Sequence, residues 1–112
     1  MECLFCKIIN REIESEVIYE DEKCMAIRDI NPQAPSHILI LPKKHIPSLR
    51  DVKEEDIYLL GYLLKIAKEI ALKENLFDGF RVVINDGARA GQSIFHLHIH
   101  LLGGRVMKWP PG

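Results

Sequence analysis

The sequence has no apolar run approaching the roughly 18 residues that a membrane-spanning helix requires, and no internal repeat or low-complexity segment. It also has no excess of one charge, because 15 basic residues stand against 16 acidic ones. Such a chain has no basic field for sequence-independent nucleic-acid binding. We therefore expect a cytoplasmic protein that binds neither membrane nor nucleic acid. Its three cysteines are too few, and odd in number, for a disulfide framework.

What the chain does have is the composition of one small globular domain. Of its 112 residues, 47% are hydrophobic and 28% charged, which predicts a single domain over residues 1–112. A chain of this length buries only about 65% of its extended surface. A second subunit or a bound metal would therefore help to stabilise it.

The hydrophobic pattern predicts strands before and after one long helix. Turn residues and alternation indicate strands at 17–20, 24–28, 37–41, 80–85 and 94–102. A short helical turn is expected over residues 5–10 and a long helix over roughly 53–75, where Asp51 and Glu54 form a capping-box pattern. This order predicts an α+β domain with an antiparallel sheet.

The predicted long helix is apolar over about half of its circumference. The apolar positions form two neighbouring stripes: Ile57, Leu60, Leu64, Ala67 and Ala71 in one, and Leu59, Leu63, Ile66 and Ile70 in the other. A helix that rests on one sheet needs a narrower stripe. The excess is explained either by deep burial within the monomer or by a partner subunit, and we favour a homodimer.

Three histidines alternate with hydrophobic residues near the end of the chain, at His96, His98 and His100. On a strand, alternate side chains share one face and lie about 7 Å apart. Three histidines could hold a zinc ion with an open coordination position for hydrolysis. Alternatively, one imidazole is a nucleophile whose neighbours donate to a charged oxygen. Spacing alone leaves both chemistries open.

Cys3 and Cys6 form a Cys-x-x-Cys pair near the start of the chain. A redox motif of this kind normally follows a strand in a βαβ pattern, which the sequence lacks. Zinc needs four ligands and the chain has no second cysteine pair, so a zinc site and two buried thiols remain as alternatives. Cys24 lies in a predicted strand and is expected in the core.

The alternating histidines and several other segments resemble one known family. Residues 96–102, His-Leu-His-Ile-His-Leu-Leu, resemble the signature of the histidine-triad family. Further segments are similar to its Hint branch, namely residues 29–37, 42–46, 82–87, 91–93, 103–105 and 109–112. The resemblance covers nearly the whole chain.

The resemblance implies a fold, an activity and an assembly. The implied fold is a five-stranded antiparallel sheet with one long helix and a short N-terminal helix, in a homodimer whose strands join across the interface. The implied activity is hydrolysis of the P–N bond in purine nucleoside phosphoramidates, in which AMP or GMP is linked to an amine. One alternative is hydrolysis of dinucleoside polyphosphates, typical of a branch without the ending at 109–112. Another is a nucleotide-binding scaffold protein whose turnover is incidental.

The resemblance also implies roles for four catalytic residues. His98 would attack the α-phosphorus and form a nucleotidyl-histidine intermediate, and neutral imidazole is a good nucleophile near neutral pH. His37 and His100 would contact the phosphoryl oxygens as charge develops. Ser93 matches the position whose hydroxyl serves the leaving nitrogen. No metal is expected to chelate the nucleotide.

Further residues match nucleotide-binding positions of the family. Asp29 would accept from the ribose hydroxyls, and Asn85 would make a second polar contact. Gly91 and Gln92 belong to the loop whose backbone N–H groups would face the phosphate. Four apolar residues would line the base pocket: Phe5, Ile8, Ile27 and Ile30. Ile27 stands where many relatives have an aromatic ring, which leaves purine preference looser.

Some histidine-triad proteins use an N-terminal Cys-x-x-Cys pair to hold structural zinc. The matching ligands here are Cys3, Cys6, His45 and His96. Thiolate and imidazole suit zinc, and four ligands leave no open position. This set also gives His96 a role apart from the phosphate chemistry of His98 and His100.

Overall fold

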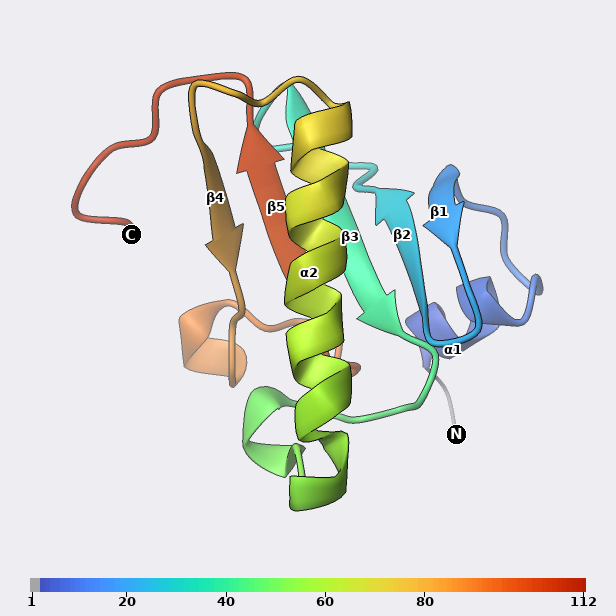
Figure 1. The fold of residues 1–112 in the computed structure, drawn as a ribbon. Coiled ribbons are helices and arrows are strands. Elements are labelled where there is room, and N and C mark those ends of the chain that lie inside the picture. The colour runs from blue at the N-terminus through green and yellow to red at the C-terminus, as the bar shows by residue number, and fades with distance from the viewer. Residues whose placement is uncertain (1–2) are drawn as a thin grey trace.

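The computed structural model describes residues 3–112, so the first two residues of the predicted domain lie outside the described residues. One antiparallel sheet has the strand order β1-β2-β3-β5-β4, and the long helix α2 lies across one of its faces (Figure 1). The elements are α1 (Leu4–Ile9), β1 (Val17–Glu20), β2 (Cys24–Arg28), β3 (Ser36–Pro42), α2 (Ile57–Lys73), β4 (Phe80–Val83) and β5 (Ile99–Gly103). The α+β fold expected from the sequence, with five strands and two helices, is confirmed.

The long helix is shorter than predicted and begins differently. Two 3₁₀ turns, Leu49–Asp51 and Glu54–Asp56, precede α2, so the predicted start at residue 53 with a cap from Asp51 is wrong. Asp56 serves this end instead, because its carboxylate accepts from the Lys53 N–H at 3.2 Å and from Lys44 Nζ at 2.6 Å. None of the helices among residues 3–112 is long and apolar enough to cross a membrane.

Strand β5 also begins later than predicted, at Ile99 rather than at residue 94. Its neighbour β3 pairs Ile40 with Ile99 and ends at Pro42, after which the chain turns away. The preceding segment bonds to that turn instead, since the Leu97 N–H donates to the Ile46 carbonyl at 2.6 Å. Of the three alternating histidines, only His100 lies on the strand, and β4 likewise stops two residues before the predicted end.

Each face of the sheet carries its own apolar cluster. Ile38 and Ile40 of β3 point toward α2, whereas Leu39 and Leu41 belong to the cluster that contains α1. The residues of α2 that are buried within the monomer are Leu63, Ile66, Ala67, Ile70 and Ala71. Ile57 and Leu64 stay exposed, at 55% and 43%. The sheet therefore covers only part of the apolar arc of α2. His37 and His100 lie on the opposite face of the sheet, with Leu39.

Candidate active site and metal centre

Two of the predicted catalytic histidines are in direct contact. His37 Nε2 of β3 lies 2.9 Å from His100 Nδ1 of β5 and 3.4 Å from Asp29 Oδ2. The ring of His98 packs at an angle against that of His100, with centroids 5.0 Å apart. His37 and His98 are buried, and His100 is partly exposed. The structure thus gathers three imidazoles and one carboxylate at one place.

Hydrogen bonds from the backbone fix which nitrogen of each contacting ring carries the proton. The Gln33 N–H donates to His37 Nδ1 at 3.0 Å, so this nitrogen is an acceptor. His37 therefore carries its proton on Nε2 and donates to His100 Nδ1. The proton of neutral His100 then lies on Nε2, on the far side of its ring from His37.

A second backbone contact sets the tautomer of His98. Its Nδ1 lies 2.7 Å from the carbonyl oxygen of His96, and a carbonyl can only accept. Nδ1 therefore carries the proton, and Nε2 keeps an unprotonated lone pair. This is the form that an imidazole nucleophile requires.

Burial keeps all three rings neutral. It lowers the pKa of His98 and of His37, although the Asp29 carboxylate opposes the shift in both. Burial, followed by the neighbouring rings of His98 and His37, lowers the pKa of His100 to about 4. The lone pair of His98 is therefore available at neutral pH without a separate base.

In the glycine-bounded loop that follows β4, two backbone N–H groups expected to face the phosphate are already hydrogen-bonded. Gly91 adopts a left-handed φ of 103°, beside the Asn85 side chain. The N–H groups of Gly91 and Gln92 donate within the loop, to Ala88 and Gly87 at 3.0 and 3.1 Å. The Gln92 side chain is buried. Ser93 is exposed, as are residues 88–91 of the same loop.

Three of the four predicted base-pocket residues lie together. Phe5, Ile8 and Ile27 are buried in the cluster on the α1 side of the sheet, and the Phe5 ring centroid lies 5.0 Å from that of His98. Ile30 does not join them and is 96% exposed. The apolar wall beside His98 is therefore built by α1 and β2.

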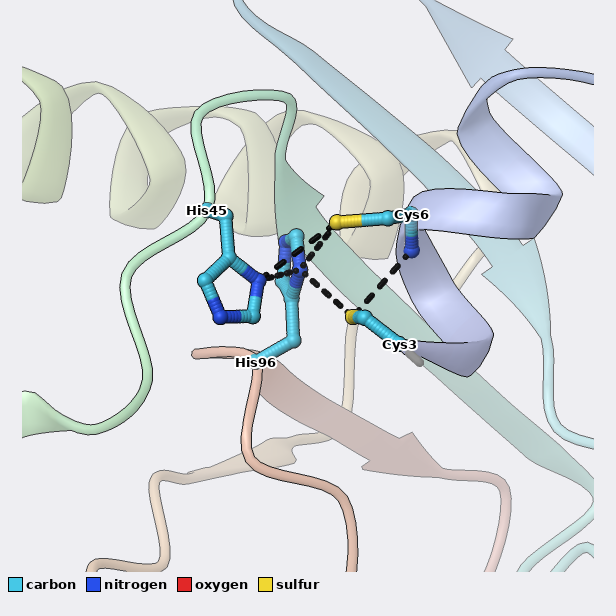
Figure 2. Close-up of side chains that lie close together, drawn as sticks. All are labelled: Cys3, Cys6, His45 and His96. Carbon is cyan, nitrogen blue, oxygen red and sulfur yellow. Dashed lines mark hydrogen bonds between the residues drawn. The ribbon is translucent and has the colours of Figure 1, made fainter. Parts of the chain in front are cut away.

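The predicted zinc ligands come together from three segments (Figure 2). Cys3 and Cys6 come from the start of α1, His45 from the turn after β3, and His96 from the segment before β5. His96 Nδ1 lies 3.4 Å from Cys3 Sγ, 3.5 Å from Cys6 Sγ and 3.1 Å from His45 Nδ1. All four donor atoms lie within 4.8 Å of one another.

The chemistry of these donors fits zinc. His96 donates from Nε2 to the Pro42 carbonyl at 2.8 Å, so its Nδ1 lone pair faces the two sulfurs. Burial lowers the pKa of His96 to about 4, which keeps this nitrogen unprotonated. Tetrahedral zinc bonds of about 2.0–2.3 Å place neighbouring sulfur and nitrogen ligands about 3.3–3.6 Å apart. The observed separations lie close to that range.

A second group, Asp29, His37 and His100, also places its donor atoms within 4.8 Å of one another. The Gln33 N–H already occupies the lone pair of His37 Nδ1. A neutral His37 therefore offers a proton, not a lone pair, at Nε2. Sequence reasoning missed this backbone contact. The one local signal in the sequence is that Gln33 lies between Pro32 and Pro35.

The antiparallel sheet, with three imidazoles gathered on one of its faces, agrees with the resemblance to the histidine-triad family. The family model of the HIT domain matches residues 10–107, and the chain belongs to this family. Along 97% of its length it is 59% identical to the "14 kDa zinc-binding protein" of Zea mays, of which it covers 87%.

Solved structures are similar in fold throughout the chain. The HIT family hydrolase from Legionella pneumophila superposes with a TM-score of 0.97 at 51% identity, over 99% of this chain and 100% of that one. The histidine triad nucleotide-binding protein from Candida albicans superposes with a TM-score of 0.83 at 32% identity, over 97% and 83% of the two chains. Both structures therefore support the five-stranded sheet and the two helices described above.

Proposed function

We propose that this protein is a nucleoside phosphoramidate hydrolase of the Hint branch, acting on AMP or GMP linked to an amine. The observation that carries the proposal is the tautomer of His98, whose Nδ1–H is bound to the His96 carbonyl and whose Nε2 is free. Similar proteins named as a hydrolase and as a nucleotide-binding protein support it. The ending at residues 109–112 favours this branch over the one that hydrolyses dinucleoside polyphosphates.

The reaction proceeds through a covalent intermediate on His98. In the first step Nε2 attacks the α-phosphorus and the P–N bond breaks. The amine leaves with the electron pair of that bond and with a proton that Ser93 relays from solvent. In the second step water attacks the phosphorus, the bond to Nε2 breaks, and the nucleoside monophosphate is released.

The two other histidines of the site stabilise the charge on phosphorus in different ways. His100 directs its Nε2–H away from His37, so it is the donor for a phosphoryl oxygen. His37 uses its own Nε2–H on His100 and therefore holds that ring in place. The proposed contact of His37 with phosphate becomes indirect in this arrangement.

The nucleoside lies between a carboxylate and an apolar wall. Asp29 binds the ribose hydroxyls, and Asn85 makes a second polar contact beside Gly91. Phe5, Ile8 and Ile27 form the wall against the base, as in most ligand clefts. Ile30 would contribute only from its exposed position.

Structural zinc, bound by Cys3, Cys6, His45 and His96, completes our proposal for the monomer. The contacts and lone pairs of these residues fit the ion, and a similar protein is named as zinc-binding. Zinc would supply no chemistry to the reaction, because its four ligands leave no open position. It would instead tie α1 to the sheet.

We further propose a homodimer in which β4 strands join, and a single domain over residues 1–112. Strand β4 is an edge of the sheet, and its Phe80 and Val82 are 38% and 36% exposed. Val82 pairs with the core residue Leu101 and so shares the face that carries α2. The cytoplasmic location stays a prediction.

The proposed function is tested by trapping the intermediate. Rapid-quench mass spectrometry of wild-type protein with an adenosine phosphoramidate should find a nucleotidyl adduct on His98. His98→Ala should lose the adduct and about three orders of magnitude in turnover. A dinucleoside polyphosphate tested alongside should turn over more slowly. Full turnover in His98→Ala would overturn the mechanism, and a variant that binds nucleotide and keeps its cellular role would favour the scaffold alternative.

A further inference from the structure

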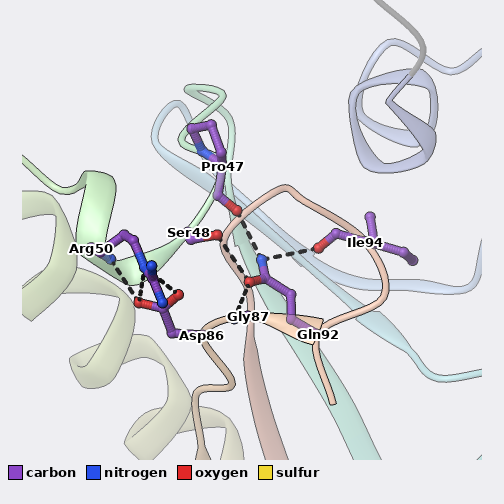
Figure 3. Close-up of polar contacts among 7 residues, drawn as sticks. All are labelled: Pro47, Ser48, Arg50, Asp86, Gly87, Gln92 and Ile94. Carbon is purple, nitrogen blue, oxygen red and sulfur yellow. Dashed lines mark hydrogen bonds and ion pairs between the residues drawn. The ribbon is translucent and has the colours of Figure 1, made fainter. Parts of the chain in front are cut away.

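The Gln92 side chain is buried between two loops and uses all of its hydrogen-bonding capacity (Figure 3). Its Oε1 accepts from the Ser48 hydroxyl and from the Gly87 N–H, both at 2.9 Å. Its Nε2 donates to the Pro47 carbonyl at 2.8 Å and to the Ile94 carbonyl at 3.2 Å. The residue is only 2% exposed.

These four contacts leave no atom of the carboxamide for a ligand. A glutamine amide has two donor hydrogens and an oxygen with two lone pairs, and all four are occupied here. Gln92 nevertheless precedes Ser93, the residue proposed to serve the leaving nitrogen. Any effect of this side chain on the reaction must therefore act through the loop that carries it.

Gln92 joins two segments of the chain. One follows the proposed zinc site, and the other leads to the proposed active site. Pro47 and Ser48 follow the metal-site residue His45, whereas Gly87 and Ile94 bracket the loop that continues to His98. Arg50 also bridges the segments, with Nε 2.9 Å from Asp86 Oδ1 (Figure 3). Because the Arg50 side chain is 73% exposed, water and salt weaken that ion pair. Gln92 is buried, so its contacts between the segments are shielded from water.

We propose that Gln92 is a positioning residue that holds Ser93 at the place where the leaving group receives its proton. The proposal rests on the proposed function, and it replaces the expectation that Gln92 itself binds nucleotide. A displacement of about 1 Å in a reacting group can lower a rate about 100-fold. Loss of the Gln92 contacts would let the loop carry Ser93 away from the leaving nitrogen.

The test compares two substrates that share the nucleotide but differ in their need for a proton. An adenosine alkylphosphoramidate releases a basic amine, whereas the 4-nitrophenyl ester of AMP releases a phenolate without protonation. The variant is Gln92→Glu, which keeps the side-chain shape but replaces the donor nitrogen facing the Pro47 and Ile94 carbonyls. The measured quantity is the rate of adduct formation on His98.

Adduct formation from the phosphoramidate should slow about 100-fold in Gln92→Glu, with KM little changed. Adduct formation from the nitrophenyl ester should change less than about threefold, because that step does not use Ser93. Ser48→Ala removes one of the two donors to Gln92 Oε1. It is a milder change than Gln92→Glu, because it buries no new charge. It should slow the phosphoramidate selectively by about tenfold.

Ile40→Val, in the cluster beneath α2, is the control for a general loss of stability and should affect both substrates equally. Equal slowing of both substrates by Gln92→Glu and Ser48→Ala, or a raised KM with unchanged kcat, would overturn the positioning role. Unchanged rates in both variants, with a normal adduct in wild type, would do the same. Absence of the adduct in wild type with either substrate would instead overturn the proposed function.

Discussion

The backbone oxygen of His96 accepts a hydrogen bond from His98 Nδ1 at 2.7 Å. The same residue turns its ring the other way, toward Cys3 and Cys6. One residue of the alternating motif therefore orients the proposed nucleophile with its main chain and belongs to the proposed zinc site with its side chain. The two proposed sites therefore adjoin through the backbone of His96, and the proposed zinc ion would take no part in the reaction.

Removing the two thiols should remove the metal but spare much of the reaction. Protein purified without chelator should contain about one zinc per chain, with sulfur ligands near 2.3 Å by X-ray absorption. Cys3→Ser combined with Cys6→Ser should abolish zinc content and lower thermal stability, because the ion no longer ties α1 to the sheet. Cys24→Ala is the matched control, since Cys24 is buried away from this cluster and zinc content should persist.

Native protein that is free of metal and equally stable would contradict the zinc site. Loss of all turnover on chelation would favour a catalytic metal.

Asp29→Ala should weaken nucleotide binding by about 1.5–3 kcal/mol, the range for hydrogen bonds to a charged group. Titration calorimetry with AMP and with its 2′,3′-dideoxy analogue separates the ribose contact from other effects. The analogue should bind wild type and variant alike, because it lacks the hydroxyls that Asp29 would accept from. If the dideoxy ligand still binds the two proteins differently, Asp29 does not act through the ribose hydroxyls. Its role would then be the contact with His37 Nε2, which lies 3.4 Å from Asp29 Oδ2.

The buried rings predict that acid destabilises the protein over a defined interval. Burial lowers the pKa of His100 to about 4 in the folded chain, whereas an unfolded histidine has a pKa of about 6.5. The unfolded state therefore binds more protons between these values, and the free energy of unfolding should fall as the pH is lowered through them. Urea titrations at several pH values measure this slope.

In His100→Gln the slope between about pH 6.5 and 4 should be smaller, because one titrating ring is missing. His37 adds to the slope in both proteins, since its pKa is also lowered by burial. An identical slope in variant and wild type would show that His100 is accessible to protons in the folded chain.

Light scattering should give about twice 12.9 kDa if the protein is a dimer. Leu64→Glu combined with Val82→Glu should yield a folded monomer, because unpaired charge is costly at an apolar contact. Ile13→Glu is the control: it places one such charge at a residue before β1 that is 39% exposed, and it should leave the dimer intact. Leu63 and Ile66 cannot serve this test, since both are buried within the monomer and charges there would unfold it. A wild-type monomer at micromolar concentration would refute the assembly.

Sequence alone predicted the features that depend on local chemistry. The bounds of β1 and β2 were correct because Asp21 makes the turn between them, accepting from Lys23 and Cys24 N–H groups. The start of β5 was wrong because it depends on where β3 ends, at Pro42. The alternation of apolar and polar residues over 94–102 cannot reveal that residues 94–98 have no neighbouring strand to pair with.

The candidate site divides in the same way. Residue types and their resemblance to a family brought His37, His98 and His100 together as candidates, and the contacts agree with that grouping. The tautomers could not be predicted, since they depend on the Gln33 N–H and the His96 carbonyl. The inward turn of Gln92 and the exposure of Ile30 depend on tertiary packing, which carries no local signal.

The departure of residues 94–98 from the sheet has a consequence for amide hydrogen exchange. Strand β5 is held between β3 and β4, so its amides should exchange only when the whole domain unfolds. The segment before it is held by single contacts, such as Leu97 to Ile46. It can therefore open by itself, at a smaller free energy. A metal ion that binds only the closed form of this segment would raise the free energy of opening in proportion to the logarithm of the ion concentration. The exchange rate of the Leu97 amide would then report how tightly the ion is bound.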